Sequence, residues 1–303
     1  MIPVQRAVEV FRAGGLVAFP TETVYGLGAD AENEGAVRRI FEVKGRPTNH
    51  PLIVHTADPW KWTQKPPADA LRLADRFWPG PLTLILKRSS RALDIVTGGQ
   101  DTVGIRVPSH PLALDLLKRF GGGVAAPSAN RFGRVTPTTA QHVRDDLGGD
   151  VDLILDGGAC EVGVESTIVD FSAGKPAILR PGGVAKEWIE ETMGYAIACP
   201  QESRVRAPGH LKSHYAPSAG VIVAKRRELN KLARELRADG LRVEVLHDPK
   251  ARDIYARLRE ADNLGANVIL VAAPSEAGLG LAVADRLRKA SNQPRRGRGA
   301  TGR

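Results

Sequence analysis

The chain of 303 residues is poor in the residues that build disulfides, metal sites and membrane spans. Its two cysteines, Cys160 and Cys199, have no CxxC or CxxH spacing, so we expect two separate buried thiols rather than a disulfide or metal ligands. No apolar run approaches the roughly 18 residues of a membrane span. The start, MIPVQRAVEVFRAGG, has no apolar signal core. These absences predict a cytoplasmic protein without membrane contact.

Several catalytic signatures are also absent. The sequence contains no HExxH and no paired-carboxylate pattern, and the absence of GxSxG argues against a serine hydrolase. Glu22, in PTET, is a single carboxylate and does not by itself make a general base. Any metal is therefore expected to arrive with a substrate, and no tightly bound organic cofactor is expected.

The positive charge is concentrated at the C-terminus. The net charge is +9, but residues 286–303 carry seven Lys/Arg and no acid, which leaves 36 Lys/Arg against 34 Asp/Glu, a net +2, in the rest of the chain. We expect residues 291–303, SNQPRRGRGATGR, to be a disordered basic tail. A solubilising end is the favoured interpretation of this tail, and a weak contact with tRNA or other RNA is the alternative.

Short apolar runs alternate with helical patterns over the first 200 residues, which predicts an α/β fold with a large mixed sheet. The expected strands lie in 15–20, 51–55, 81–87, 102–108, 123–128, 152–158, 166–171 and 177–182. The expected helices are 4–13, 34–43, 69–77, 110–119, 139–147 and 184–192. Several strands run into hydroxyl or cationic residues, as in FPTET, VPSHP, APSAN and LRPGG. Ligands bind beyond such strand ends in open α/β sheets, so we expect the site there.

A proline-rich stretch divides the chain. Residues 200–218, PQESRVRAPGHLKSHYAPS, have no periodicity and are predicted to be a linker between a domain at 1–199 and one at 219–290. Lys212, His214 and Tyr215 give it a polar and aromatic cluster that a passive spacer would not need. The second domain repeats strand and helix three times, which predicts a small Rossmann-like parallel unit. It lacks GxGxxG and GxxxxGK[ST], and GLGLA at 278–282 indicates a helix start rather than a nucleotide site.

The stretch KGRPTNHPLIVH (44–55) places Lys44 and Arg46 on either side of Gly45, after a helix and before a buried strand. Such cations could complement the negative end of the helix dipole, or they could face a polyanion. Together with Arg106 and Arg180, they form a set of cations on loops at sheet ends that suits phosphates or carboxylates. Nucleotidyl transfer needs such positioned charge more than a covalent nucleophile. The residues alone therefore predict that a phosphorylated small molecule binds in an α/β cleft.

Six ordered motifs make the chain similar to a known family. PTETVYGLGADA, KGRP..HPLIVH, GIRVPSHP, APSANRFGRVTPT, ESTIVD and ILRPG resemble the YrdC-like threonylcarbamoyl-AMP synthases over about residues 1–195. The linker and second domain resemble the long, two-domain form. The resemblance implies a twisted mixed sheet with helices around a concave positive cleft. It also implies a reaction in which L-threonine, bicarbonate and Mg²⁺-bound ATP give threonylcarbamoyl-AMP, pyrophosphate and water. The product would pass to the machinery that transfers the threonylcarbamoyl group to tRNA.

The resemblance also implies site residues. Lys44 and Arg46 would be catalytic and face the nucleotide phosphates, with Ser128 and Asn130 opposite them. The residues implied around threonine are Thr23, His55, Arg106, Ala126 and Ser166, with Arg106 on the carboxylate. The residues implied around ATP are Lys44, Arg46, His50, Thr102, Ser128, Asn130, Thr136, Arg180 and Tyr215. Many members carry Asn at the position of His50.

The linker has an implied role as a lid, with Lys212 and Tyr215 closing over the nucleotide. A competing interpretation is a binding module for double-stranded RNA or a ribosomal element in the same cleft, although the near-neutral body disfavours it. A carbamoyl-transfer maturation enzyme would share only the first domain and would need acyl-phosphatase-like and zinc segments that are absent. An inactive relative is disfavoured because Lys44, Arg46, Ser128 and Asn130 are all present.

Overall fold

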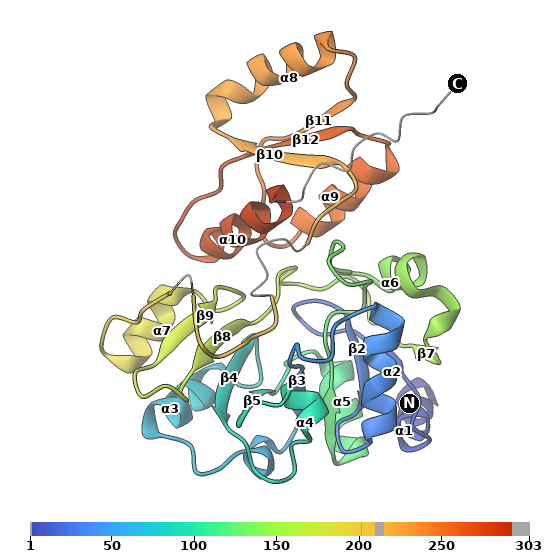
Figure 1. Cartoon of the computed structure of the whole chain (residues 1–303), viewed down its shortest axis with the longest axis vertical. Coiled ribbons are helices and arrows are strands. Elements are labelled where there is room, and N and C mark those ends of the chain that lie inside the picture. Colours follow the sequence, from blue (N-terminus) through green and yellow to red (C-terminus); the bar gives the residue numbers. More distant parts are fainter. Residues whose placement is uncertain (1, 201, 210–214, 293–303) are drawn as a thin grey trace.

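The computed structural model describes residues 2–200, 202–209 and 215–292, and it confirms the predicted α/β class. A nine-stranded mixed sheet has the order β7-β1-β2-β6-β3-β5-β4-β8-β9, and a three-stranded sheet has the order β10-β12-β11 (Figure 1). Among these residues no helix has the length and apolarity to cross a membrane. The predicted division at 1–199, 200–218, 219–290 and 291–303 stays a prediction, and residues 293–303, Lys212 and His214 lie outside the described residues.

The large sheet contains every strand expected from the sequence and one more. Its strands are β1 (Val17–Phe19), β2 (Gly26–Asp30), β3 (Ile53–Thr56), β4 (Leu82–Lys87), β5 (Thr102–Arg106), β6 (Gly123–Ala125), β7 (Leu153–Ile154), β8 (Thr167–Asp170) and β9 (Ala177–Arg180). β2 was not expected, because GLGAD has no β-branched or aromatic residue. Its Gly28 is required by packing, since a Cβ there would lie 2.6 Å from Val124 and 2.8 Å from Phe19.

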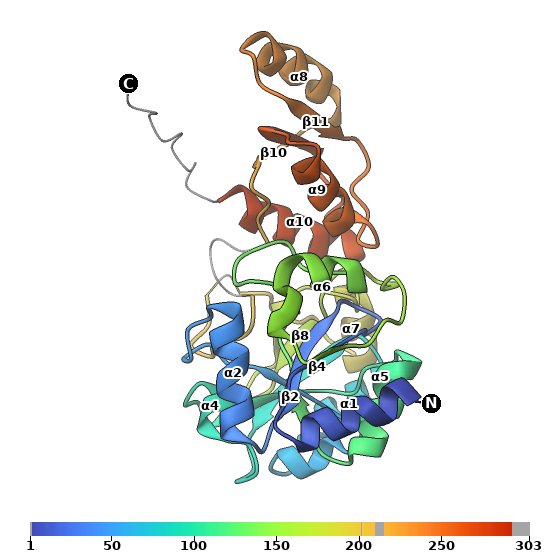
Figure 2. The ribbon, with the colours of Figure 1, turned by 90° about the vertical axis from the view of Figure 1, so that its right-hand side faces the viewer.

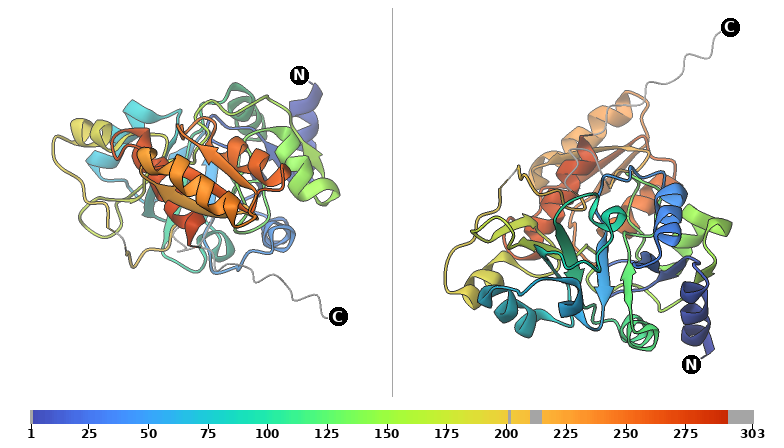
Figure 3. Two further views of the ribbon diagram at one scale, coloured as in Figure 1. Left: turned by 90° about the horizontal axis from the view of Figure 1, so that it is seen from above. Right: turned by 60° about the horizontal axis from the view of Figure 1, so that its bottom comes forward.

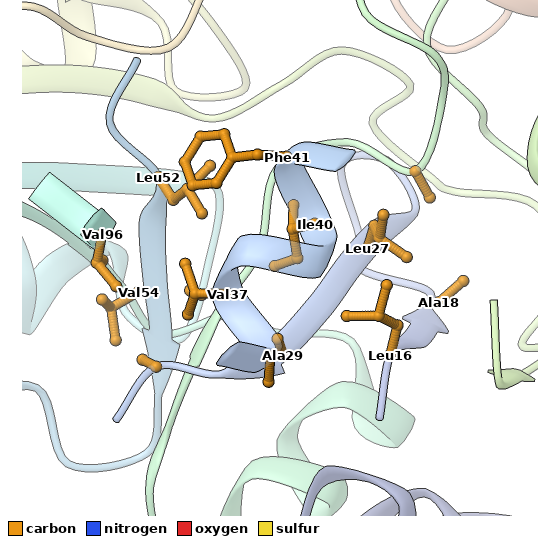
Figure 4. Packing of buried hydrophobic residues seen from close by; sticks show 14 of the residues in the cluster. Leu16, Ala18, Leu27, Ala29, Val37, Ile40, Phe41, Leu52, Val54 and Val96 are labelled. Atoms are coloured by element: carbon orange, nitrogen blue, oxygen red, sulfur yellow. The ribbon is translucent and has the colours of Figure 1, made fainter. Parts of the chain in front are cut away.

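Helices cover both faces of the large sheet (Figure 2). They are α1 (Ile2–Arg12), α2 (Glu34–Lys44), α3 (Ala68–Phe77), α4 (Asp94–Thr97), α5 (Pro111–Phe120), α6 (Ala140–Leu147) and α7 (Lys186–Met193). Val37 and Ile40 of α2 pack with Leu27 and Val54 on one face (Figure 4). Helices α1 and α5 pack on the other face, in a cluster that includes Phe19. Because strand side chains alternate between faces, the neighbouring residues Ala18 and Phe19 pack in the clusters on opposite faces of the sheet.

Helix α2 ends where the sequence predicted. Asn33 caps its start by accepting a hydrogen bond from the Ala36 amide, and Gly45 ends it in the left-handed conformation at φ 62°. The left-handed turn suits glycine because glycine has no Cβ to clash. The turn aims the chain back across the sheet, so that Lys44 and Arg46 arrive beside the ends of β3 and β6, where the site is found.

The small sheet is parallel, as predicted. It consists of β10 (Gly220–Ala224), β11 (Val243–Leu246) and β12 (Val268–Ala272), with helices α8 (Leu229–Ala238), α9 (Ile254–Asn263) and α10 (Leu279–Ser291). Helix α8 covers one face, whereas α9 and α10 cover the face toward the large sheet (Figures 1 and 2). Seen from above, this unit lies over the middle of the larger one (Figure 3).

The two cysteines have different environments. Both are free thiols, as expected, and Cys160 is buried in the main core. The expectation that Cys199 is buried is wrong, because this residue is exposed. Ile197 is the last side chain before the linker that packs into the core beside α7, and Cys199 lies beyond it.

Candidate functional site

A small cavity of about 50 Å³ lies at the carboxyl ends of several strands of the large sheet. Predicted site residues from distant parts of the sequence line it: Arg46, His55, Arg106, Ala126, Ser128, Ser166, Arg180 and Tyr215. Arg106 and Arg180 are the last residues of β5 and β9, and Ser166 precedes β8. The strand ends that the sequence marked with hydroxyls and cations therefore converge on one point.

The other predicted site residues lie behind or beside the cavity wall. The Thr23 hydroxyl contacts the hydroxyl of the lining residue Thr21 at 2.8 Å, and Thr136 donates to the lining Glu165 at 2.8 Å. His50 packs edge-on against Phe132. Thr102 lines a neighbouring cavity, which Arg206 and Pro208 also line. Lys44 and Asn130 are both buried, and they contact each other next to the cavity.

Lys44 holds the loop that carries Ser128 and Asn130. Its Nζ donates to the Ser128 carbonyl at 2.6 Å and to the Asn130 carbonyl, and lies 3.5 Å from Asn130 Oδ1. The Ser128 hydroxyl donates to that same Oδ1 at 2.6 Å. Burial lowers the pKa of Lys44 well below its ordinary value, and the nearby Arg46 lowers it further. In this conformation the ammonium fixes the shape of the cavity wall instead of lining it.

Two buried guanidinium groups in the wall have no carboxylate partner among the described residues. Arg46 is 8% exposed and donates Nη2 to the Pro51 carbonyl at 3.0 Å, and its buried Nε has no hydrogen-bond partner among those residues. Arg180 is 4% exposed and donates to Ser166 and Pro208 oxygens at 2.9–3.1 Å. Burial lowers the pKa of Arg46 to about 10, so it stays charged at neutral pH. Buried charges without an opposite charge are costly, and Arg46 in particular points to an anionic ligand. Arg180 has the charge of Glu165 nearby, but that carboxylate is already paired with Arg286.

Arg106 has a different environment. It forms a buried ion pair with Glu22 at 2.7 Å, and Nε lies 3.3 Å from the Gly80 carbonyl. Glu22 also accepts a hydrogen bond from the Ser109 amide at 3.1 Å. The pair fixes the guanidinium at the wall and offsets its charge. The sequence showed Glu22 as an isolated carboxylate, because its partner is 84 residues away.

His55 is a neutral hydrogen-bond acceptor. Burial, reinforced by the charge of Arg106, lowers its pKa to about 3. Its Nδ1 lies 3.3 Å from the Ile53 carbonyl, which can only accept, so Nδ1 carries the proton. The unprotonated Nε2 is then left with a lone pair on a residue that lines the cavity.

A buried ionic network joins the cavity to the second domain. Glu165 lines the cavity and accepts hydrogen bonds from Arg286 Nε at 2.8 Å and from the Tyr255 hydroxyl at 2.9 Å. The pKa of Glu165 falls to about 2 because the charges of Arg286 and Arg180 outweigh its desolvation. Arg286 also pairs with Asp285 at 2.7 Å. No motif marked Arg286 or Tyr255, and only the folded chain brings them to the site.

Residues of the predicted linker form part of the cavity wall. Pro208, Gly209 and Tyr215 line it, and Tyr215 is 1% exposed. The ring of Tyr215 stacks on Tyr255 with centroids 5.9 Å apart, and Arg286 lies 5.1 Å from its centre. Tyr215 has φ 63°, a strained value for a residue with a Cβ. Ligand pockets usually measure about 300–1,000 Å³. The cavity is therefore smaller than a typical ligand pocket.

The site contains no ready-made cage for a metal ion. Within residues 2–200, 202–209 and 215–292, no group of three or more His, Cys, Asp or Glu could hold one. The cavity's carboxylate, Glu165, and the adjacent Glu22 are both engaged by arginines. A metal at this site would consequently be held mainly by the ligand that brings it.

Comparisons with known proteins cover both domains. The family profile described as "Telomere recombination" matches residues 9–182, and that described as "Threonylcarbamoyl-AMP synthase, C-terminal domain" matches residues 184–292. A Pyrococcus abyssi protein named threonylcarbamoyl-AMP synthase is 43% identical, covering 94% of this chain and 93% of that protein. A Bacillus subtilis protein of the same name is 40% identical, covering 95% and 92%. The crystal structure of P. abyssi Sua5 complexed with L-threonine aligns with a TM-score of 0.91 at 43% identity, covering 95% of this chain and 94% of that one.

Proposed function

The chain belongs to the threonylcarbamoyl-AMP synthase family, and we propose that its cavity joins L-threonine, bicarbonate and ATP into threonylcarbamoyl-AMP, releasing pyrophosphate and water. The observation that carries this proposal is that two buried arginines, Arg46 and Arg180, line one cavity whose carboxylate, Glu165, is already paired with Arg286. A polyphosphate supplies the negative charge that such a pair lacks.

The threonine subsite lies at the Arg106 end of the cavity. The solved P. abyssi relative was crystallised with L-threonine, which supports a subsite for the same amino acid here. Arg106, fixed by Glu22, offers further N–H groups to the amino-acid carboxylate. The neutral His55 would accept a hydrogen bond through Nε2 from the threonine hydroxyl or amine. Thr23, Ala126 and Ser166 complete the proposed subsite.

The ATP subsite lies toward Arg46 and the linker. Arg46 and Arg180 would bind the phosphates, and Ser128 would donate from the opposite wall. Lys44 and Asn130 would contribute by holding Ser128 in place, or would turn toward the phosphates when the cavity opens. His50, Thr102, Thr136 and Tyr215 are further proposed contacts. ATP would enter as its Mg²⁺ complex, with the triphosphate supplying the ligands of the metal.

The proposed chemistry has two steps. The threonine amine, after losing a proton, attacks the bicarbonate carbon and a carbamate forms with loss of water. A carbamate oxygen then attacks the α-phosphorus of ATP, and the bond to pyrophosphate breaks. Arg46 and Arg180 would stabilise the charge that develops on the departing pyrophosphate. Since a carbamate is short-lived in water, a closed linker would protect it, and this supports the lid proposal.

The product would serve a second protein. A mixed anhydride of a carbamate and AMP hydrolyses readily, so we propose direct use by the machinery that transfers the threonylcarbamoyl group to tRNA. A weak contact of this chain with tRNA through residues 291–303 is part of the same proposal, and those residues carry four arginines.

An omission experiment tests the proposed function. Purified full-length protein is incubated with Mg²⁺-ATP, L-threonine and bicarbonate, and pyrophosphate release is followed with each component left out in turn. We expect release only when all are present, together with a product of the mass of threonylcarbamoyl-AMP. Release that ignores threonine and bicarbonate would indicate a different nucleotide enzyme. A folded protein that releases none would favour the RNA-binding alternative.

A further inference from the structure

A second and larger hollow lies at the boundary between the two domains. It measures about 580 Å³ and is lined by the carboxyl ends of the small sheet, the start of α10, and Glu161 and Val162 of the large domain. None of the proposed catalytic residues lines it. We call it the crevice. Its volume falls within the range of about 300–1,000 Å³ that ligand pockets usually have.

The crevice lies at a switch point of the small sheet. β10 and β12 are neighbours, but the chain leaves β10 toward α8 and leaves β12 toward α10. These helices cover opposite faces: α8 packs on Val268 and Leu270, whereas α10 packs with Ile269 and Val271 (Figure 1). The two connections separate at the carboxyl ends and leave a hollow between them. Ligands of open α/β sheets bind at such points.

Cations line this hollow. Arg226 follows β10, and Arg252 lies between β11 and α9. Neither guanidinium has a hydrogen bond or an ion pair with any residue that the structure describes. Lys250, by contrast, pairs with Asp248 at 3.3 Å, which leaves Glu161 as the other carboxylate in the lining. Two unpaired guanidinium groups on one hollow favour an anionic ligand.

The start of α10 adds positive potential. Leu279 and Gly280, its first residues, line the crevice, and a 13-residue helix carries a partial positive charge at this end. The end already attracts an anion, because the Gly278 amide lies 3.3 Å from a carboxylate oxygen of Glu187. Gly280 could not be larger, since a Cβ there would lie 2.2 Å from the Ser275 carbonyl. Glycine is thus required here by the packing of α10 against Ser275.

We propose that the crevice binds a small phosphorylated ligand of the size of a nucleoside phosphate. Arg226, Arg252 and the start of α10 bind the phosphate. The apolar wall of Val162, Ala272 and Val283 receives the rest of the ligand. The site needs neither a GxGxxG nor a GxxxxGK[ST] loop, because side-chain cations provide the charge that those loops provide through backbone amides.

The crevice has two connections to the catalytic cavity. The Val162 amide donates to the Glu22 carbonyl at 2.8 Å, and Glu22 pairs with Arg106. Helix α10 lines the crevice with Val283 and reaches the cavity network through Arg286. A bound ligand would thus contact both domains and hold them together, which predicts a higher melting temperature.

Calorimetric titration of the full-length Arg46→Ala variant tests this proposal, because that background weakens phosphate binding in the catalytic cavity. The probes are ADP, inorganic pyrophosphate and inorganic phosphate at fixed ionic strength. We expect at least one probe to bind and to raise the melting temperature. Adding Arg226→Glu should weaken that binding at least tenfold. Arg227→Glu is the matched control, because Arg227 is exposed and does not line the crevice.

Two results would overturn the proposal. One is the absence of binding by all three probes at millimolar concentration in a folded protein. The other is equal affinity of the Arg226→Glu and Arg227→Glu variants, which would place the ligand elsewhere. If the Arg46→Ala background fails to fold, the same titration is made with the wild-type chain. Two binding sites per chain, one of which is lost in Arg226→Glu, would support the proposal. A single binding site would contradict it.

Discussion

The cavity and the crevice are both lined by arginines, but these are buried in the cavity and exposed in the crevice. Arg46 and Arg180 are buried beside a space of about 50 Å³, whereas Arg226 and Arg252 are exposed around one of about 580 Å³. Burying an unpaired charge destabilises a fold, so the buried pair indicates a ligand strongly. An exposed arginine costs little, and salt screens its charge. The cavity should thus bind tightly and specifically, and the crevice weakly and with salt dependence.

Arg46→Ala should have the largest effect. Removing one preorganised donor to developing charge typically lowers turnover about 10²–10³-fold. The free energy of unfolding should change little, because the variant loses the hydrogen bond to Pro51 but also removes a buried charge with an unpartnered Nε. Pyrophosphate release and denaturant unfolding measure the two effects. Turnover within twofold of wild type would remove Arg46 from the mechanism, and Arg46→Lys shows whether charge alone suffices.

Glu165→Gln tests the link between the two regions. Gln keeps the shape but leaves Arg286 without its carboxylate across the domain boundary, and breaking a buried pair costs about 3–5 kcal/mol. We expect the free energy of unfolding to fall by about 3 kcal/mol, because Asp285 still neutralises part of the charge. Combining Glu165→Gln with Arg286→Met should restore part of the loss. Additive losses in the double variant would show that the pair is not coupled.

The buried His55 makes stability depend on pH. Its folded pKa of about 3 lies below the ordinary value of 6.5, so the unfolded chain gains a proton below pH 6.5 that the folded chain does not. Stability is thus lost as pH falls below 6.5. Between pH 7 and pH 5 the loss due to His55 should be about 2 kcal/mol. Denaturant unfolding of wild type and His55→Gln at both pH values isolates the contribution of His55. An equal change in the free energy of unfolding between pH 7 and pH 5 in the two proteins would refute the prediction.

Tyr215→Ala should weaken the closed state of the cavity. The variant loses the stack on Tyr255, and an aromatic pair contributes about 0.5–1.5 kcal/mol beyond its buried area. We expect up to about a tenfold lower kcat/KM for ATP, which corresponds to the upper end of that range. Tyr215→Phe keeps the ring and serves as the control. If Tyr215→Ala has the kinetics of wild type, the linker is not a lid at this residue.

Arg226→Glu should have the smallest effect on basal turnover, which we expect to stay within twofold because the crevice lies outside the cavity. The crevice should differ from the cavity in its salt dependence. The affinity of the wild-type crevice for its ligand should fall as ionic strength rises, since its cations are exposed. Titrations at low and high salt check this. Affinity that does not change with salt would contradict the contrast between the two sites.

The fold class, the family and most residues of the cavity wall could be predicted from the sequence. The contacts that hold this wall in place could not. Glycine and proline mark the ends of elements locally, which is why α2 and most strands could be placed. β2 could not be placed, because the glycines of GLGAD are required by close packing against Phe19 and Val124 and give no strand pattern. The Glu165–Arg286 pair joins residues 121 apart, and no local pattern encodes such a contact. The inward turn of Lys44 depends on the loop that it meets, and that loop is 84 residues away.

The most direct test of the central claim follows the carbon of bicarbonate. The protein is supplied with Mg²⁺-ATP, L-threonine and carbon-13 bicarbonate, and the adenylate product is analysed by mass spectrometry. The account predicts that the label appears in threonylcarbamoyl-AMP, and that Arg46→Ala makes far less of this product while Arg226→Ala makes as much as wild type. An adenylate without the label, or equal amounts of labelled product from all three proteins, would contradict it.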